Sequence, residues 1–175
     1  DRWGGERLSD GRGGRRRVTQ LPQVEAWIAG DGPLGPPLRA LAKTLGMAER
    51  VRFLGDVRDA DLPGLYRQAD VFVLPATSRA EAFGIVLLEA MASGLPCITT
   101  ELGTGTSWVV RHGETGLIVP PQDAPALAAA IGQLAADPAL RARMGTAGRA
   151  RVLAEFTRAR RARQVEEVYR DVLQS

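Results

Sequence analysis

From Val24 onward, short apolar runs alternate with amphipathic segments, and this alternation constrains the fold more than any other feature of the sequence. The apolar runs cover residues 24–29, 51–54, 71–74, 97–99 and 117–119. The run at 71–74 is apolar at every position, which is typical of a strand that is covered on both faces. Strands separated by single helices favour right-handed crossovers and a parallel sheet. The sequence therefore predicts an α/β fold, a Rossmann-like doubly wound parallel sheet of about five strands.

Glycine, proline and aspartate mark the ends of the predicted helices. Gly46 ends a helix that Pro36 and Pro37 open, and Gly94 closes a helix over 83–93. Asp123 is expected to cap the N-terminus of a later helix. Further helices are expected over 62–69, near 107–111, and at the C-terminus over 138–155 and 157–173.

Residues 1–20 differ from the rest of the chain. They hold six arginines against three acids, which accounts for the whole formal charge of +3. Neither helical nor strand periodicity is present there, so we interpret residues 1–20 as an irregular basic segment, the degraded start of a domain that covers residues 21–175. A nucleic-acid-binding protein would carry its basic excess on a folded face. We therefore expect no nucleic-acid partner.

Length and composition restrict the class of protein. A chain of 175 residues is long enough for one well-buried domain. No apolar run approaches the ~18 residues that cross a bilayer, and no apolar stretch follows the Arg-rich start as in a secretory signal. Cys97 is the single cysteine, which excludes an internal disulfide and fits a reducing compartment. We expect a cytoplasmic protein, or one peripheral to the inner face of the membrane.

The candidate site lies in loops that follow the predicted strands, because ligands of doubly wound sheets bind at the carboxyl ends of the strands. These loops cover residues 30–32, 55–58 and 76–83. The third loop runs into Glu81–Ile85, which opens the next predicted helix. Free N–H groups at a helix start attract anions, and Gly84 lets a phosphate come close. Relief of crowding between helix and sheet is an equally good explanation of Gly84.

Two acids flank this predicted phosphate site. Glu81 and Glu89 are eight residues apart, so on a continuous helix their Cα atoms would lie roughly 12 Å apart and within about 80° of one face. Carboxylates suit the vicinal hydroxyls of a sugar and a ribose. The sequence neighbours of Glu89 are apolar, and a charged group in an apolar setting suggests a functional role. The alternative is a helix N-terminal acid followed by an ordinary surface or buried paired acid.

The segment from Glu81 to Pro96 resembles the E-x7-E signature of the GT4-like retaining glycosyltransferases, whose members have a two-domain GT-B fold. The resemblance extends through four other segments and covers the chain from about Val24 to the C-terminus; the segments are 30–33, 51–55, 66–75 and 113–121. It implies that this chain is the C-terminal, donor-binding half of such an enzyme. The N-terminal half, which would bind an acceptor glycan or lipid-linked sugar, is expected to be absent.

The resemblance assigns roles to individual residues. Glu81 would bind the hydroxyls of the donor sugar, and Glu89 would hold the ribose. The backbone N–H groups of Phe83, Gly84 and Ile85 would bind the diphosphate and sugar. Val57 would touch the base through its backbone, in the groove beside Gly55.

The start of the chain departs from the family pattern. The family has G-R-L-x3-K-G after a first strand, and its Arg and Lys neutralise the leaving diphosphate. Here Glu6 replaces the first glycine, Arg12 replaces the lysine, and Arg7 is kept. The preceding strand is missing, which suggests truncation or a discontinuity. Arg7 and Arg12 are the candidate catalytic cations, together with Glu81.

The expected function is transfer of a hexose from a nucleotide diphosphate sugar to an acceptor hydroxyl, with no metal, no cofactor and little turnover by this chain alone. Two alternatives stay open: a nucleotide-sugar epimerase of GT-B type, and a non-catalytic nucleotide-binding module. His112 is the only histidine and has no partner at metal-ligand spacing. Cys97 and Trp108 are interpreted as packing residues. The arginines of 158–163 are expected to face solvent or the absent domain, with anionic lipid as an alternative.

Overall fold

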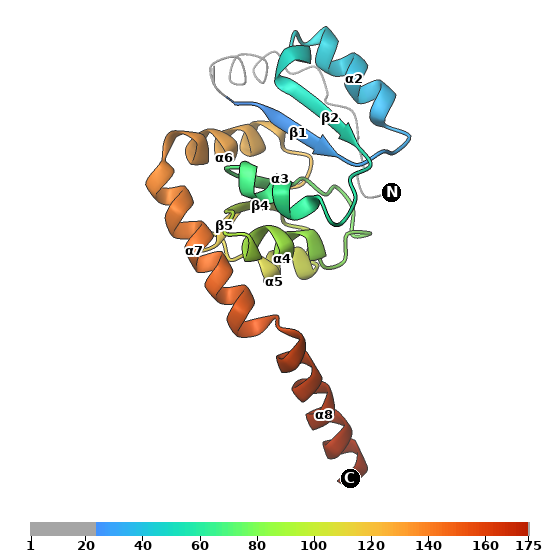
Figure 1. Ribbon diagram of the computed structural model, residues 1–175, viewed down its shortest axis with the longest axis vertical. Helices are drawn as coiled ribbons and strands as arrows, with labels where there is room; N and C mark the ends of the chain where they lie inside the picture. The colour runs from blue at the N-terminus through green and yellow to red at the C-terminus, as the bar shows by residue number, and fades with distance from the viewer. Residues whose placement is uncertain (1–23, 175) are drawn as a thin grey trace.

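Five parallel strands form the centre of residues 24–174, the part of the chain that the computed structural model describes (Figure 1). Strand β1 (Ala26–Ala29) pairs with β2 (Val51–Gly55). Strand β4 (Cys97–Thr100) lies between β3 (Phe72–Leu74) and β5 (Gly116–Val119), and both of these pairings are parallel. The predicted α/β class and the parallel strand direction are confirmed.

The strands form two sheets, however, and not the single continuous sheet that we expected. One sheet contains β1 and β2 and the other contains β3, β4 and β5; no ladder joins β1 to β3 within the described residues. In the usual doubly wound order 3-2-1-4-5-6, the first strand lies in the middle of the sheet. The pair β1–β2 corresponds to the second and third strands of that order, and β3–β5 to the fourth, fifth and sixth. The division thus falls where the first strand of that order would lie.

Helices connect the strands at nearly the predicted positions. They are α2 (Gly35–Thr44), the 3-10 turn η1 (Ala48–Arg50), α3 (Leu62–Gln68), α4 (Ile85–Ala92), α5 (Gly105–Val109), α6 (Ala124–Ala136), α7 (Pro138–Glu155) and α8 (Arg158–Gln174). Gly46 has a φ of 68° just beyond α2, which is the conformation of a helix-ending glycine. Asp123 accepts a hydrogen bond from the Ala126 N–H over 2.8 Å, so the predicted N-cap is confirmed.

The core lies on both faces of the sheet β3–β5, as a doubly wound arrangement requires. Neighbouring residues of β4 point to opposite faces: Cys97 packs in the cluster that contains Leu87 and Met91 of α4, and Ile98 packs in the cluster that contains Leu134 of α6. Cys97 is fully buried, and this burial raises the pKa of its thiol. The interpretation of Cys97 as a packing residue is confirmed.

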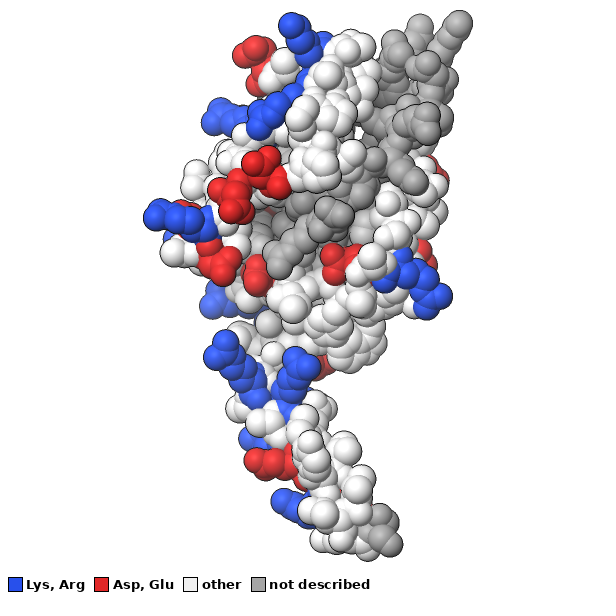
Figure 2. Space-filling model, turned by 90° about the vertical axis from the view of Figure 1, so that its right-hand side faces the viewer, with Lys and Arg blue, Asp and Glu red and all other residues white. Residues whose placement is uncertain are grey.

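Helix α8 extends away from the rest of the structure (Figure 1). All of its described residues are exposed, in contrast to those of α7. Basic side chains gather where α8 leaves the body of the molecule (Figure 2). Within residues 24–174, none of the helices combines the length and the apolar character that a bilayer span requires.

Candidate functional site

Two loops, at the carboxyl ends of β3 and β4, are joined to each other by hydrogen bonds. Residues 75–84 follow β3, and residues 101–104 follow β4. The Gly105 N–H donates to the Ala82 carbonyl oxygen over 2.8 Å, and the Thr104 hydroxyl donates to the Glu81 carbonyl oxygen over 3.1 Å. The predicted loop at 76–83 is therefore held against the loop after β4, at the carboxyl ends of the strands, where ligands of this fold bind.

Helix α4 begins at Ile85, and the prediction that it begins at residue 83 is wrong. The reason is Gly84, which has φ 77° and ψ 57°, a left-handed conformation that breaks the helical path. Glu81 thus lies in a turn before the helix, whereas Glu89 lies within it. Because the two acids are not on one continuous helix, the distance and angle estimated for them from the sequence do not apply.

The turn before α4 presents backbone N–H groups in the way an anion site requires. The Gly84 N–H donates to Glu81 Oε1 over 3.0 Å. Among residues 24–174, the N–H groups of Phe83 and Ile85 have no acceptor. Ile85 is 65% exposed, so an anion can reach this helix start. A carboxylate of the chain itself already occupies one of the three predicted amides.

A side chain at position 84 would also crowd two neighbouring leucines. A Cβ there would lie 2.7 Å from Leu87 Cδ1 and 3.4 Å from Leu74 Cδ2. The explanation of Gly84 by crowding between helix and sheet is therefore supported. The prediction of a phosphate site at this turn therefore depends on the N–H groups of Phe83 and Ile85 and not on the presence of a glycine.

Glu89 is exposed, so its apolar sequence neighbours do not surround its carboxylate. Leu87, Ala90 and Met91 are buried on the other side of α4, and the sequence argument from an apolar setting was wrong for that reason. Glu89 nevertheless has a defined partner, since Tyr66 Oη donates a hydrogen bond to Glu89 Oε2 over 3.0 Å.

The loops after β1 and β2 meet at the same ends of their strands. Gly55 has a φ of 68°, and its carbonyl oxygen accepts the Gly30 N–H over 2.7 Å. Val57 is half-buried. Within the described part of the chain, its backbone N–H and C=O have no hydrogen-bond partner. This backbone is therefore available to a ligand, as the prediction for Val57 requires.

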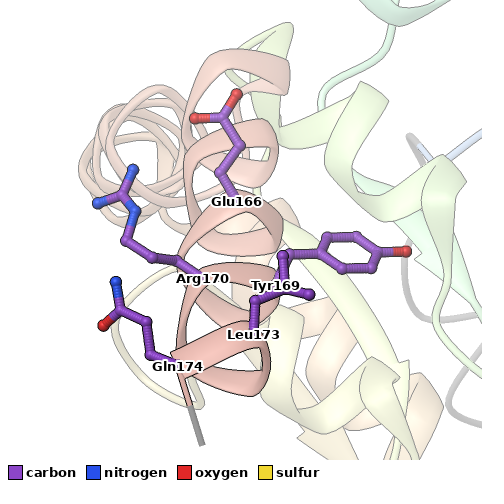
Figure 3. Close-up of a pocket in the computed structure, with 5 residues that line it drawn as sticks. All are labelled: Glu166, Tyr169, Arg170, Leu173 and Gln174. Carbon is purple, nitrogen blue, oxygen red and sulfur yellow. The ribbon is translucent and has the colours of Figure 1, made fainter.

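Two hollows of the described surface lie away from the turn before α4. One of about 470 Å³ runs along α8 and is lined by Glu166, Tyr169, Arg170, Leu173 and Gln174 (Figure 3). A second of about 490 Å³ is lined mainly by β5, α6 and α7. Neither of these two hollows is lined by a predicted site residue.

Sequence reasoning missed the parts that Gly105 and Phe156 play in supporting the turn. A Cβ at Gly105 would lie 2.8 Å from the Ala82 carbonyl oxygen and 2.8 Å from Phe83 Cδ2, so α5 can approach the turn only with glycine there. The Phe83 ring lies 6.2 Å from that of Trp108, and the Trp108 ring lies 5.0 Å from that of Phe156. Trp108 was predicted to be a packing residue, but it is 57% exposed, so only part of its ring packs against Phe83 and Phe156.

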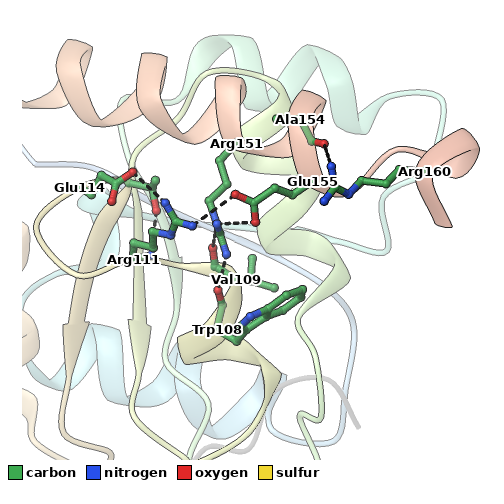
Figure 4. A network of polar contacts seen from close by, with 9 residues as sticks. Trp108, Val109, Arg111, Glu114, Arg151, Ala154, Glu155 and Arg160 are labelled. Atoms are coloured by element: carbon green, nitrogen blue, oxygen red, sulfur yellow. Dashed lines mark hydrogen bonds and ion pairs between the residues drawn. The ribbon is translucent and has the colours of Figure 1, made fainter. Parts of the chain in front are cut away.

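A buried arginine holds this aromatic group in place (Figure 4). Arg151 of α7 donates to the carbonyl oxygens of Trp108 over 2.8 Å and Val109 over 3.2 Å, and it pairs with Glu155 over 2.6 Å. Its side chain is 4% exposed. The signal for Arg151 was available in the sequence, because it follows the buried Met144 and Gly148 at helical spacing on the inward stripe of α7.

The two candidate arginines, a metal site and His112 remain to be placed. Arg7 and Arg12 lie outside the described residues. Among residues 24–174, no group of three His, Cys, Asp or Glu side chains has the geometry of a metal site. His112 is exposed in its loop, and its Nδ1 accepts the Ile118 N–H over 3.0 Å.

Comparison with known families matches residues 15–151 to the family described as glycosyl transferases group 1. The chain belongs to this family. The chain is 43% identical over 139 residues to the D-rhamnosyltransferase WbpZ of Pseudomonas aeruginosa. The aligned residues cover 79% of this chain and 35% of WbpZ.

Solved structures agree with this family assignment. Sucrose-phosphate synthase from Thermosynechococcus elongatus superposes with a TM-score of 0.79 at 35% identity, over 91% of this chain and 41% of the synthase. Anabaena Alr3699/HepE in complex with UDP superposes with a TM-score of 0.81 at 28% identity, over 95% of this chain and 47% of HepE. HepE has also been solved with UDP-glucose. These neighbours are GT-B glycosyltransferases, so the predicted Rossmann-like fold of GT-B type is confirmed. The group 1 glycosyltransferase chain spans less than half the length of each of these proteins.

Proposed function

We propose that this chain is the donor-binding half of a retaining glycosyltransferase, which moves a hexose from a nucleotide diphosphate sugar to an acceptor hydroxyl. The observation that supports this most directly is the turn before α4, where the N–H groups of Phe83 and Ile85 lack an acceptor among the described residues. This turn is fixed to the loop after β4 at the carboxyl end of the sheet. A helix start with unengaged amides favours the two negative phosphates of such a donor.

The proposed roles follow the order of groups in the donor. The diphosphate takes the N–H groups of Phe83, Gly84 and Ile85, and it displaces the Glu81 carboxylate from Gly84. Glu81 then accepts the sugar hydroxyls. Glu89 accepts the ribose hydroxyls, and the backbone of Val57 beside Gly55 meets the base. The UDP and UDP-glucose complexes of the structural neighbour HepE support a nucleotide-sugar ligand.

In the proposed reaction, the leaving diphosphate helps to deprotonate the acceptor on the same face of the sugar. Stabilisation of charge on that diphosphate is the main catalytic contribution. Arg7 and Arg12 are the proposed cations, and no metal or cofactor takes part. An acceptor glycan or lipid-linked sugar would be bound by a preceding N-terminal half, so we propose that this chain alone binds donor and transfers little or no sugar. Peripheral contact with anionic lipid through the arginines of 158–163 is part of the same proposal.

Calorimetry with UDP, GDP and ADP and their hexose derivatives tests the proposal. We expect one base to bind, and Glu89→Ala to weaken that nucleotide at least about tenfold, because a charged hydrogen bond to ribose is worth about 1.5–3 kcal/mol. Glu114→Ala is the matched control, since Glu114 is an exposed acid in the loop before β5. Failure of the wild type to bind any of these nucleotides would refute the proposal. Robust transfer by this chain alone would refute the division of labour with an N-terminal half.

A further inference from the structure

We propose that Tyr66 is a positioning residue for Glu89, and that its hydroxyl holds the Glu89 carboxylate in the orientation that receives a ribose. The inference rests on the proposed function, because it extends the same donor site by one residue. Tyr66 lies on α3 and Glu89 on α4. The hydrogen bond from Tyr66 Oη to Glu89 Oε2 over 3.0 Å joins these two helices, and the two residues are 23 positions apart in sequence.

Tyr66 is itself held firmly. It is 9% exposed and belongs to the core cluster that contains Leu87 and Met91. Its ring meets the Phe72 ring of β3 edge to face, with 5.8 Å between centroids and 69° between planes. Because the ring is packed on the sheet, its hydroxyl is a fixed donor at the margin of the core.

Glu89 lacks such support of its own. It is exposed, and a free glutamate in water loses considerable rotamer entropy when it binds a ligand. The bond from Tyr66 restricts the carboxylate before a ligand arrives, which lowers that entropic cost. An ionised carboxylate has about four lone-pair sites. Tyr66 occupies one of them, so both oxygens keep the capacity to accept a hydroxyl.

A structural explanation of the same bond is that a buried tyrosine needs some partner for its hydroxyl. That role and the positioning role predict different results when the hydroxyl alone is removed. Loss of a purely structural bond weakens all ligands equally. Loss of a positioned carboxylate weakens only ligands whose ribose hydroxyls the carboxylate receives.

The test uses Tyr66→Phe in the full chain, because phenylalanine keeps the ring and its packing. Calorimetry compares UDP, GDP and ADP with the 2′-deoxy form of each. We expect the wild type to prefer the ribonucleotide that binds, and Tyr66→Phe to reduce this preference about three- to tenfold while affinity for the deoxynucleotide stays nearly constant. Tyr169→Phe is the matched control, because Tyr169 is the only other tyrosine and is exposed on α8. It should change neither affinity.

A second measurement ties the effect to Glu89. In a Glu89→Ala background the ribose preference should already be lost, and Tyr66→Phe should reduce it no further. Equal weakening of ribo- and deoxynucleotides by Tyr66→Phe, or an unchanged preference, would overturn the inference while nucleotide binding stands. A wild-type chain that binds no nucleotide would instead remove the proposed function, and this inference with it.

Discussion

The last two helices, α7 and α8, are similar in length and in arginine content, but one is packed against the rest of the chain and the other is exposed. They contain 18 and 17 residues, both are rich in arginine, and both have apolar residues at helical spacing. Helix α7 packs closely on α4, whereas every described residue of α8 is exposed. The two helices show that periodicity predicts a helix and its apolar face, but not whether that face has a partner.

Small residues explain why α7 can pack so closely. Gly145 lies against the backbone carbonyl of Gly94 at the end of α4, and Gly148 lies against Met91. Absence of a side chain at these two positions lets the helix axes approach. In α8 the corresponding stripe is Val165, Val168 and Tyr169, which are all exposed.

The largest expected effect comes from a side chain placed in the close contact between α7 and the end of α4. Gly145→Ala places a Cβ against the Gly94 carbonyl oxygen, and this backbone atom cannot move aside cheaply. We expect the free energy of unfolding to fall by at least about 3 kcal/mol, measured by urea denaturation. Gly64→Ala in α3 is the control, because a Cβ there meets no atom within 4 Å and a helical alanine should stabilise by about 0.5–1 kcal/mol. Equal effects of the two changes would contradict the packing argument.

The next effect concerns the buried charge of α7. Arg151→Met removes the donors for the Trp108 and Val109 carbonyl oxygens and leaves Glu155 with Arg111 as its remaining partner. We expect a loss of about 2 kcal/mol in the free energy of unfolding. Arg163→Met on α8 keeps the chemistry of the change at an exposed position, where less than about 0.5 kcal/mol is expected. A stable Arg151→Met protein would show that the network supports neither α5 nor α7.

The smallest effect is expected on α8. Val168→Ser removes an apolar side chain that is 63% exposed, so little buried area is lost and the free energy of unfolding should change by less than about 0.5 kcal/mol. Val109→Ser is the internal comparison, because Val109 is fully buried and the same kind of change there should cost about 2 kcal/mol or more. If Val168→Ser destabilised the chain as strongly, α8 would have a partner within it.

Much of the fold, and the position of the candidate site within it, could be predicted from local patterns in the sequence. The glycines at helix ends, the aspartate N-cap at Asp123 and the apolar strands each depend on neighbouring residues, so they could be predicted without tertiary contacts. The position of the site at the carboxyl ends of the strands followed from strand–helix alternation. The start of α4 could not be predicted, because a left-handed Gly84 and a helical glycine look alike in sequence.

The sequence by itself determined the α/β class, the family and the position of the site at the carboxyl ends of the strands, because these depend on residue spacing along the chain. The tertiary structure decided that the strands form two sheets, that the Glu81 carboxylate accepts the Gly84 N–H, and that the Tyr66 hydroxyl donates to Glu89. It also decided that Arg151 supports the aromatic group beside the turn, whereas α8 has an exposed apolar face. Such contacts join residues far apart in the chain, and their formation depends on the packing of whole elements.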